Sequence, residues 1–378
     1  MTSRERLLAV IGGQIPDHVP VAPDTSNMIP CKLTGKPFWD IYLYQDPPLW
    51  LAYINCVKHF GFDSLMDGYA PVEFDDLIFE ENIFDQTAIV FQNAERIITR
   101  DFYQVNGKRR WADKVNVYYV ADPPTAGVDP LAVHLPKEPE HFVKLEGVRP
   151  WPKGEALLAL VKEELGDHGL AGVYCGTTKL VNTEQEIYDF YDNPAKFYDK
   201  RDRLLDYYEK RFNRLMSLSC KPDFIATGGS GTLIHQSLET FRALGLPIVK
   251  KMTALAKLHG LPSHIHSCGP EKDLVKICAE ETDLTIIDPL EIPPMGDCDL
   301  GELKKRYGDK LVLKGNLHTT SVMLHGSVAD VVEASKKAID DAAEGGRFIL
   351  STGDQCGRDT PFENIFAMIE TAGTYGKY

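Results

Sequence analysis

The sequence predicts an α/β protein folded as a single (β/α)8 TIM barrel, with a β-hairpin inserted in its N-terminal part. Short apolar runs alternate with longer stretches of helical periodicity along most of the 378 residues. Almost every apolar run ends in a polar or glycine-rich segment, and one segment departs from the alternation. A (β/α)8 barrel takes about 250 residues before insertions, so one barrel domain over residues 1–378 accounts for the length.

Eight apolar runs are predicted as barrel strands because they are short, contain β-branched or aromatic residues, and are bounded by glycine, proline or aspartate. They are 18–23, 62–68, 169–176, 222–229, 262–269, 284–291, 310–317 and 347–354. The segments between them repeat apolar residues three and four positions apart, as amphipathic helices do. The clearest helical segments are 155–166, 193–219, 236–260 and 327–346. This alternation favours a parallel sheet covered by helices.

The segment that departs from the alternation lies at about 95–121. Its two halves are rich in aromatic and β-branched residues, and Asn106-Gly107 stands between them. That dipeptide favours the positive φ angles of a type I′ turn. The segment is therefore predicted as a β-hairpin inserted between early barrel strands.

The composition excludes several classes of protein. With 43% hydrophobic and 25% charged residues, the chain is predicted to be soluble and globular. Lys and Arg number 41 against 55 Asp and Glu, and the net charge of -14 disfavours a nucleic-acid partner. Neither a signal peptide nor an apolar run of about 18 residues is present, so we expect a cytoplasmic protein without membrane contact.

The eight cysteines are scattered, without the density of a secreted disulfide scaffold. Most are expected to be buried apolar residues, and the rest are candidates for metal ligands or nucleophiles. In an extended strand, His264, His266 and Cys268 point to the same face. The His-x-Cys pair of His266 and Cys268 is, taken alone, more often part of a buried core than of a metal site.

A third residue favours the metal interpretation. Cys356 follows the last predicted strand, so it lies on the same rim of the barrel as His266 and Cys268. One imidazole and two thiolates suit zinc and leave a fourth position open, as in catalytic zinc sites. His264 lies one pleat deeper and is expected to be a packed histidine.

Further polar residues end the predicted strands. They are candidates for a fourth ligand, for support of a ligand, for substrate contact or for simple capping: Asp288, Glu291, Asn316, His318 and Asp354. Of these, catalytic roles are assigned to Asp354, Glu291 and His318, and a cofactor contact to Asn316. Gly229 and Ser230, in "TGGSG", are also predicted to contact a cofactor, because glycine permits the close approach of a bulky group.

Several of these motifs resemble the uroporphyrinogen decarboxylase superfamily. The likeness is carried by "SRERLLAVIGGQIPDHVPV", "HSCGPEKDL", "KGNLHTT" and "FILSTGDQCGRDTPFENIFAMIETAGTYGKY". It implies a single (β/α)8 barrel over nearly the whole chain. True decarboxylases of the superfamily carry an arginine-rich segment after the first strand, whereas this chain has "APDTSNMIPCKLTG". A porphyrinogen with many carboxylates needs cationic partners, so decarboxylation is disfavoured.

The other branch of the superfamily contains methyltransferases that act on the cobalt of a corrinoid protein. Those resembling methylcobalamin:coenzyme M methyltransferase bind zinc through a pattern that His266, Cys268 and Cys356 match. The resemblance therefore implies zinc, a corrinoid (cobalamin) carried by a partner protein, and a homodimer.

The methyl donor is predicted less directly. The segment "SNMIPCKLTGKPFWDIYLYQDPPLW" is similar to the first methyltransferase of O-demethylase systems. This similarity favours a methoxylated aromatic as the donor and cob(I)alamin as the acceptor. The alternatives are methyl transfer to a thiol, porphyrinogen decarboxylation and a non-catalytic zinc-binding barrel.

Overall fold

The computed structural model describes residues 1–66, 68–79 and 83–378. The chain divides into two compact units. Unit 1 comprises Met1–Thr25, Val57–Leu77 and Lys153–Tyr378, and unit 2 comprises Ser26–Cys56 and Ile78–Pro152. We describe each unit by itself, and the assignment of residues 1–378 to one domain stays a prediction.

Unit 1 contains a seven-stranded parallel sheet of TIM-barrel type, ordered β1-β8-β9-β10-β11-β12-β13. The strands are β1 (Ser64–Met66), β8 (Gly169–Tyr174), β9 (Phe224–Ala226), β10 (Ser263–His266), β11 (Ile286–Asp288), β12 (Val312–Leu317) and β13 (Phe348–Thr352). Each lies inside a predicted strand, so seven of the eight strand predictions are confirmed. The predicted run 62–68 also includes Asp67, which lies outside the described residues.

The eighth predicted strand, 18–23, is reduced to two isolated bridges, Val21 with Leu350 and His18 with Lys377. Leu350 exchanges hydrogen bonds with this segment on one side, through Ala22 N (2.8 Å) and Pro20 O (2.9 Å). On the other side, Asp63 N donates to Val21 O at 2.8 Å, just before β1. The segment therefore hydrogen-bonds both edges of the sheet, but its prolines remove donors that a regular strand needs.

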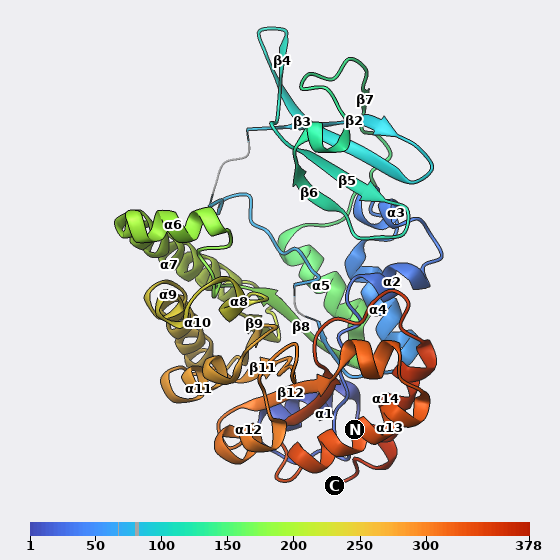
Figure 1. Ribbon diagram of the computed structural model, residues 1–378, viewed down its shortest axis with the longest axis vertical. Coiled ribbons are helices and arrows are strands. Elements are labelled where there is room, and N and C mark those ends of the chain that lie inside the picture. Colours follow the sequence, from blue (N-terminus) through green and yellow to red (C-terminus); the bar gives the residue numbers. More distant parts are fainter. Residues whose placement is uncertain (67, 80–82) are drawn as a thin grey trace. The chain divides into compact units, whose positions relative to one another are not determined.

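Helices follow the strands and lie outside the sheet (Figure 1). The longer ones in unit 1 are α1 (Ser3–Ile11), α5 (Gly154–Leu165), α6 (Glu184–Asp192), α7 (Pro194–Met216), α10 (Leu246–Leu258), α11 (Lys272–Glu281), α12 (Leu300–Tyr307), α13 (Val328–Ala342) and α14 (Phe362–Thr374). Shorter turns are η2 (Gly166–His168), α8 (Thr232–His235), α9 (Leu238–Thr240), and the π-helical η3 (Phe241–Gly245) and η4 (Thr319–Leu324). The four predicted helical segments are confirmed.

Local sequence explains these helices. In α13, Ser327 and Asp330 form a capping box that satisfies two backbone donors at the start of the helix. Its buried residues recur every three or four positions: Val331, Ser335, Ala338, Ile339 and Ala342. One face of α13 is thereby buried, and it packs against β12 and β13.

An apolar layer occupies the amino-terminal end of the parallel strands. It joins α1 to the starts of six strands and to the segment before β1: Leu7, Val10, Ile11, Ala22, Leu65, Leu170, Phe224, Ile286, Val312 and Ile349. The apolar layer is at the amino-terminal end of the strands, so the polar groups lie at their carboxyl ends, where TIM barrels carry their functional sites.

Unit 2 is built on a six-stranded antiparallel sheet, ordered β6-β5-β3-β2-β7 with β4 paired to β3. Its elements are α2 (Met28–Leu33), α3 (Phe38–Tyr42), β2 (Gln86–Gln92), β3 (Arg96–Val105), β4 (Lys108–Trp111), β5 (Val115–Tyr119), β6 (Thr125–Val128), η1 (Pro130–Val133) and β7 (Val143–Lys144). The helix α4 (Leu49–Phe60) continues from unit 2 into unit 1.

The predicted hairpin is present but is only part of this sheet. Asn106 (φ 51°) and Gly107 (φ 73°) connect β3 to β4, and Val105 pairs with Lys108. Two positive φ angles are what a type I′ turn requires. The prediction of a lone hairpin at 95–121 was wrong in extent, because strands on both sides of that range pair with it.

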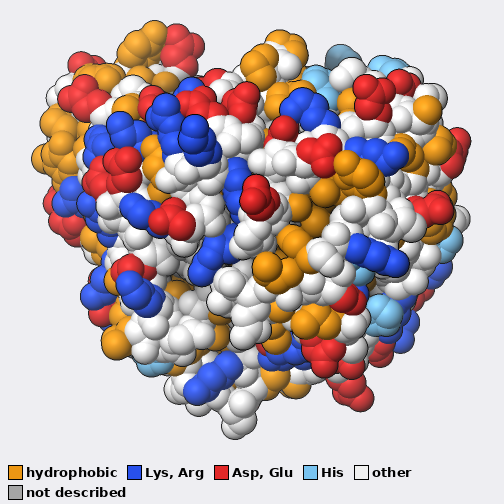
Figure 2. Space-filling view, turned by 90° about the horizontal axis from the view of Figure 1, so that it is seen from below, with side chains coloured by type: hydrophobic (Ala, Val, Ile, Leu, Met, Phe, Trp, Pro, Cys, Tyr) orange, Lys and Arg blue, Asp and Glu red, His pale blue; other side chains and the backbone are white. Residues whose placement is uncertain are grey.

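No helix in the described ranges is long and apolar enough to cross a membrane. On the face shown in Figure 2, acidic and basic side chains are interspersed with hydrophobic ones.

Candidate metal centre

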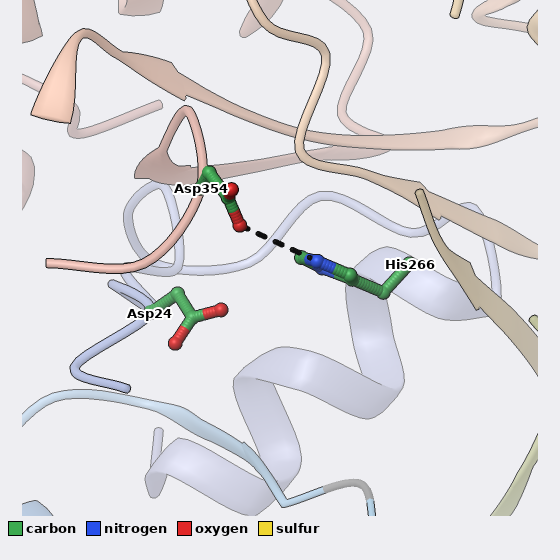
Figure 3. A group of neighbouring side chains, drawn as sticks. All are labelled: Asp24, His266 and Asp354. Carbon is green, nitrogen blue, oxygen red and sulfur yellow. Dashed lines mark ion pairs between the residues drawn. The ribbon is translucent and has the colours of Figure 1, made fainter. Parts of the chain in front are cut away.

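Two clusters of metal-ligating side chains lie at the carboxyl ends of the parallel strands of unit 1. The first contains Asp24, His266 and Asp354, and the second contains Cys268, Glu291 and Asp354. Within each cluster the ligand atoms lie within 4.8 Å of one another. Figure 3 shows the first cluster, in which the His266 ring points toward the Asp354 carboxylate. Asp354 is common to both clusters, which therefore form one continuous polar site.

His266, at the end of β10, has a different environment at each ring nitrogen. Its Nδ1 lies 3.3 Å from Asp288 Oδ1, because His266 and Asp288 are in register on neighbouring strands. Its Nε2 lies 3.4 Å from Asp354 Oδ1. Nε2 is buried and forms no hydrogen bond of normal geometry within the described residues. A histidine that is held by a carboxylate at one nitrogen and makes no hydrogen bond at the other has the usual arrangement of a metal ligand.

Asp288 is the centre of a buried charge network. Besides His266, it contacts His264 Nε2 at 2.9 Å through Oδ1 and the Lys314 ammonium through Oδ2. Burial alone would raise the pKa of Asp288, but Lys314 and the two histidines outweigh it and hold that pKa well below its usual range. Conversely, burial would lower the pKa of His266, but Asp288 raises it well above its usual value. Asp288 is therefore a carboxylate that orients His266.

Cys268 lies in the loop after β10. Its Sγ is 2.8 Å from the hydroxyl oxygen of Ser230, which belongs to the loop after β9. Glu291 is buried and accepts a hydrogen bond from Gly269 N. Burial, followed by the nearby Asp354 charge, raises the pKa of Glu291 above its usual value. The Cys268 sulfur and the carboxylate oxygens of Glu291 and Asp354 lie within 4.8 Å of one another, close enough to share one metal ion.

Asp354 has a backbone φ of 112°, a region that residues other than glycine rarely adopt. Such a conformation costs about 1–3 kcal/mol and tends to occur at functional sites. Cys356, two residues later, is buried, and its backbone N donates to Asp24 O at 2.8 Å. Cys356 thus follows the same strand as Asp354, although its sulfur belongs to neither cluster.

The other predicted site residues have structural contacts. His318 caps η4, because its Nδ1 accepts from Thr320 N (3.1 Å) and Ser321 N (3.2 Å). Asn316 is buried and donates to Leu290 O at 2.9 Å. Gly229 exchanges hydrogen bonds with the Thr178 hydroxyl, 3.2 Å from its N and 3.3 Å from its O. None of these three belongs to either cluster in the described structure.

Reasoning from sequence missed two contributors. Asp24 directly follows the apolar run 18–23, so its position at a strand end was the available signal. Lys314 occurs within an apolar strand, where a lysine needs a buried partner. Asp288 was considered as a ligand or supporting group, and the structure places it against His266.

The residues present fit a zinc ion. The clusters offer one imidazole nitrogen, one thiol and several carboxylate oxygens, all of which are zinc ligands. The His266 Nε2 atom is buried and has no hydrogen-bond partner in the described chain, so it is available as a metal ligand. It lies near the Asp354 carboxylate, and so does the Cys268 sulfur. A zinc site with two thiolate ligands, the second from Cys356, remains a prediction from the sequence.

Comparison with known proteins places the chain in a family. The model of the uroporphyrinogen decarboxylase (URO-D) family matches residues 187–375, which is half of the chain. A structure described as a methyltransferase from Methanosarcina mazei covers 99% of each chain at 15% identity, with a TM-score of 0.62. That likeness shows the fold.

Other similarities are weaker. A B12-independent methionine synthase from Shewanella sp. aligns over 62% of this chain and 70% of its own, at 9% identity and a TM-score of 0.33. A search of curated proteins finds no match. By the family match over half of its length, the chain belongs to the uroporphyrinogen decarboxylase family.

Proposed function

We propose that the protein is a zinc-dependent methyltransferase that moves a methyl group from an aryl methyl ether to the cob(I)alamin of a corrinoid protein. The observation that carries the proposal is a pair of ligand clusters at the carboxyl ends of the strands, one with the His266 imidazole and one with the Cys268 thiol, which share the Asp354 carboxylate. Membership of the family and a fold shared with a protein described as a methyltransferase support it.

In this proposal His266, Cys268 and Cys356 hold the zinc, and Asp354 or Glu291 completes or flanks the coordination. Zinc bound there supplies a Lewis acid for the ether oxygen, where negative charge develops as the methyl group departs. Asp288 keeps the His266 Nε2 directed into the site through its contact with Nδ1. Ser230 restrains the Cys268 sulfur in the same way.

The charge of the site selects against a porphyrinogen. Asp24, Glu291 and Asp354 line it, and the Lys314 ammonium is engaged by Asp288. A substrate with many carboxylates would face like charges here, whereas a neutral methyl ether would not. The absence of arginine from "APDTSNMIPCKLTG" agrees with this argument.

A partner protein must bring its corrin ring close to the methyl donor, and Gly229 offers a place to test that approach. A Cβ on Gly229 would meet Thr178 Oγ1 at 3.5 Å and Lys179 Cε at 3.7 Å, which are ordinary contacts. Gly229→Ala is therefore expected to fold normally and, in this proposal, to slow only the transfer to the protein-bound acceptor. We propose a corrinoid protein as the partner and a homodimer as the assembly.

A second candidate is methyl transfer to a thiol. The set of His266, Cys268 and Cys356 resembles that of methylcobalamin:thiol methyltransferases, and a zinc-bound thiol loses its proton readily. This reaction would use the same centre with a different acceptor.

The deciding experiment follows the absorbance change from cob(I)alamin to methylcobalamin with methoxyaromatics, methanol, methylamines and methylthiols as donors, and measures the zinc content. Cys268→Ala should lose zinc and methyl transfer. The matched control is Cys220→Ala, which alters another partly buried cysteine outside both clusters.

Transfer to a free thiol alone would favour the second candidate. Release of carbon dioxide from a porphyrinogen without methylation by any donor would overturn both. A fully active, zinc-free Cys268→Ala protein would exclude the zinc site.

A further inference from the structure

Unit 2 contains a cavity beside its antiparallel sheet, and none of its lining residues belongs to the candidate metal centre. Its volume is about 170 Å³, and most of its wall is apolar. Val90 and Val115 come from the sheet, whereas Leu135 and three prolines come from the segment 130–139. An engineered apolar cavity of about 150 Å³ accommodates benzene, so this space has the size of one small ring or branched alkyl group.

One cationic side chain, Arg100 of β3, lines the cavity. Arg100 is only 5% exposed. Nε donates to Ala112 O at 2.6 Å and Nη1 donates to Lys137 O at 2.7 Å, so both observed bonds go to backbone carbonyls. Within the described residues, the guanidinium's hydrogen bonds go to these two carbonyls and none goes to a carboxylate.

A buried guanidinium without an anion is unusual, because buried charges are normally paired. The Nη2 group makes no hydrogen bond in the described chain and is not among the fully buried unsatisfied atoms. Nη2 of Arg100 therefore keeps two N–H donors without a partner in the described chain, and one of them lies beside the second N–H of Nη1 on a single edge of the guanidinium. Arginine binds carboxylates in this way through its planar edge.

We propose that this cavity binds a small apolar monocarboxylate, with the carboxylate on Arg100 and the ring or branched alkyl group among Val90, Val115 and Leu135. Glu140 and His141 also line the cavity, but both side chains are exposed. The charge of Glu140 is therefore screened by solvent and opposes the ligand only weakly. This inference is independent of the proposed methyl transfer.

The test measures binding to the full-length protein by calorimetry, with benzoate and 3-methylbutanoate as ring and branched probes. Binding of either supports the proposal, and binding of neither overturns it. Acetate should bind about tenfold or more weakly because it buries little apolar surface. Benzamide, which has the shape of benzoate without the charge, should also bind about tenfold or more weakly. Equal affinity for benzoate, acetate and benzamide would overturn the proposal.

Two variants locate the site. Arg100→Met removes the charge, and Leu135→Trp fills the cavity while leaving the two backbone hydrogen bonds of Arg100 in place. Each should weaken benzoate binding about tenfold or more. Glu140→Gln should strengthen it or leave it unchanged. Arg100→Met also removes two hydrogen bonds to backbone carbonyls and so perturbs folding, whereas Leu135→Trp keeps them; Leu135→Trp with a native circular dichroism spectrum therefore decides the matter.

Cys268→Ala is the control for binding at the metal centre and should bind benzoate as the wild type does. Loss of binding in Cys268→Ala together with full binding in Leu135→Trp would place the ligand elsewhere and refute the inference.

Discussion

The buried network of Asp288, Lys314 and His266 supports a quantitative prediction. Lys314→Met leaves the Asp288 carboxylate, 1% exposed, facing only two histidines. Asp288→Asn removes the carboxylate that contacts the Lys314 ammonium, whose side chain is 8% exposed. Removing one partner of a buried ion pair costs about 3–5 kcal/mol, so each single variant should lose about that much unfolding free energy.

The double variant Asp288→Asn, Lys314→Met removes both charges and keeps similar volumes. A neutral replacement of a buried pair is often neutral or stabilising, so its unfolding free energy should lie within about 2 kcal/mol of the wild type. Its zinc affinity should nevertheless fall about 10–100-fold, because His266 loses the carboxylate that orients it. The double variant thereby separates the effect of the ion pair on unfolding free energy from the effect of Asp288 on the orientation of His266.

Urea unfolding of the zinc-free proteins, followed by circular dichroism, measures the first quantity, and competition with a chromophoric zinc chelator measures the second. Lys337→Met is the matched control, because Lys337 is exposed and pairs with the partly exposed Asp341 on α13, and the pair should contribute less than about 1 kcal/mol. If the two single losses simply add in the double variant, the charges are not coupled. If the double variant binds zinc as the wild type does, Asp288 does not orient His266.

Three further predictions concern other parts of unit 1. Burial alone would raise the pKa of Asp223, but hydrogen bonds from Arg4 and Lys162 outweigh it and lower that pKa. The stabilisation is therefore complete above the unfolded value of about 3.9 and is lost as pH falls through the folded value. Asp223→Asn should cost about 1–3 kcal/mol at neutral pH and less in acid, and a cost independent of pH would contradict this. Asp354→Gly should raise the unfolding free energy by about 1 kcal/mol by relieving the positive φ, while zinc affinity falls; a protein both destabilised and normal in zinc binding would refute the role given to Asp354. Ser230→Ala should reduce zinc affinity by up to about tenfold in chelator competition, with Ser219→Ala as the unaffected control.

The strands and helices of unit 1 were largely predictable from sequence because their patterns are local. The apolar runs that became β8 to β13 carry their own boundaries of glycine, proline and aspartate. The segment 18–23 was predictable as part of the sheet, but its reduction to isolated bridges was not. That outcome depends on which of its backbone groups reach neighbours distant in sequence, such as Leu350. The extent of the sheet in unit 2 was missed because antiparallel pairing of short strands such as β7 leaves little local signal.

For the candidate site, sequence by itself determined the kinds of chemistry available. His266, Cys268, Glu291 and Asp354 all follow strands, and parallel strands bring their carboxyl ends to one edge. Only the tertiary structure decided which of these groups meet. The register that pairs His266 with Asp288, and the placement of Asp24 beside β13, arise from hydrogen bonds between segments remote in sequence. Such distances depend on how the sheet closes, and no local pattern of residue types encodes them.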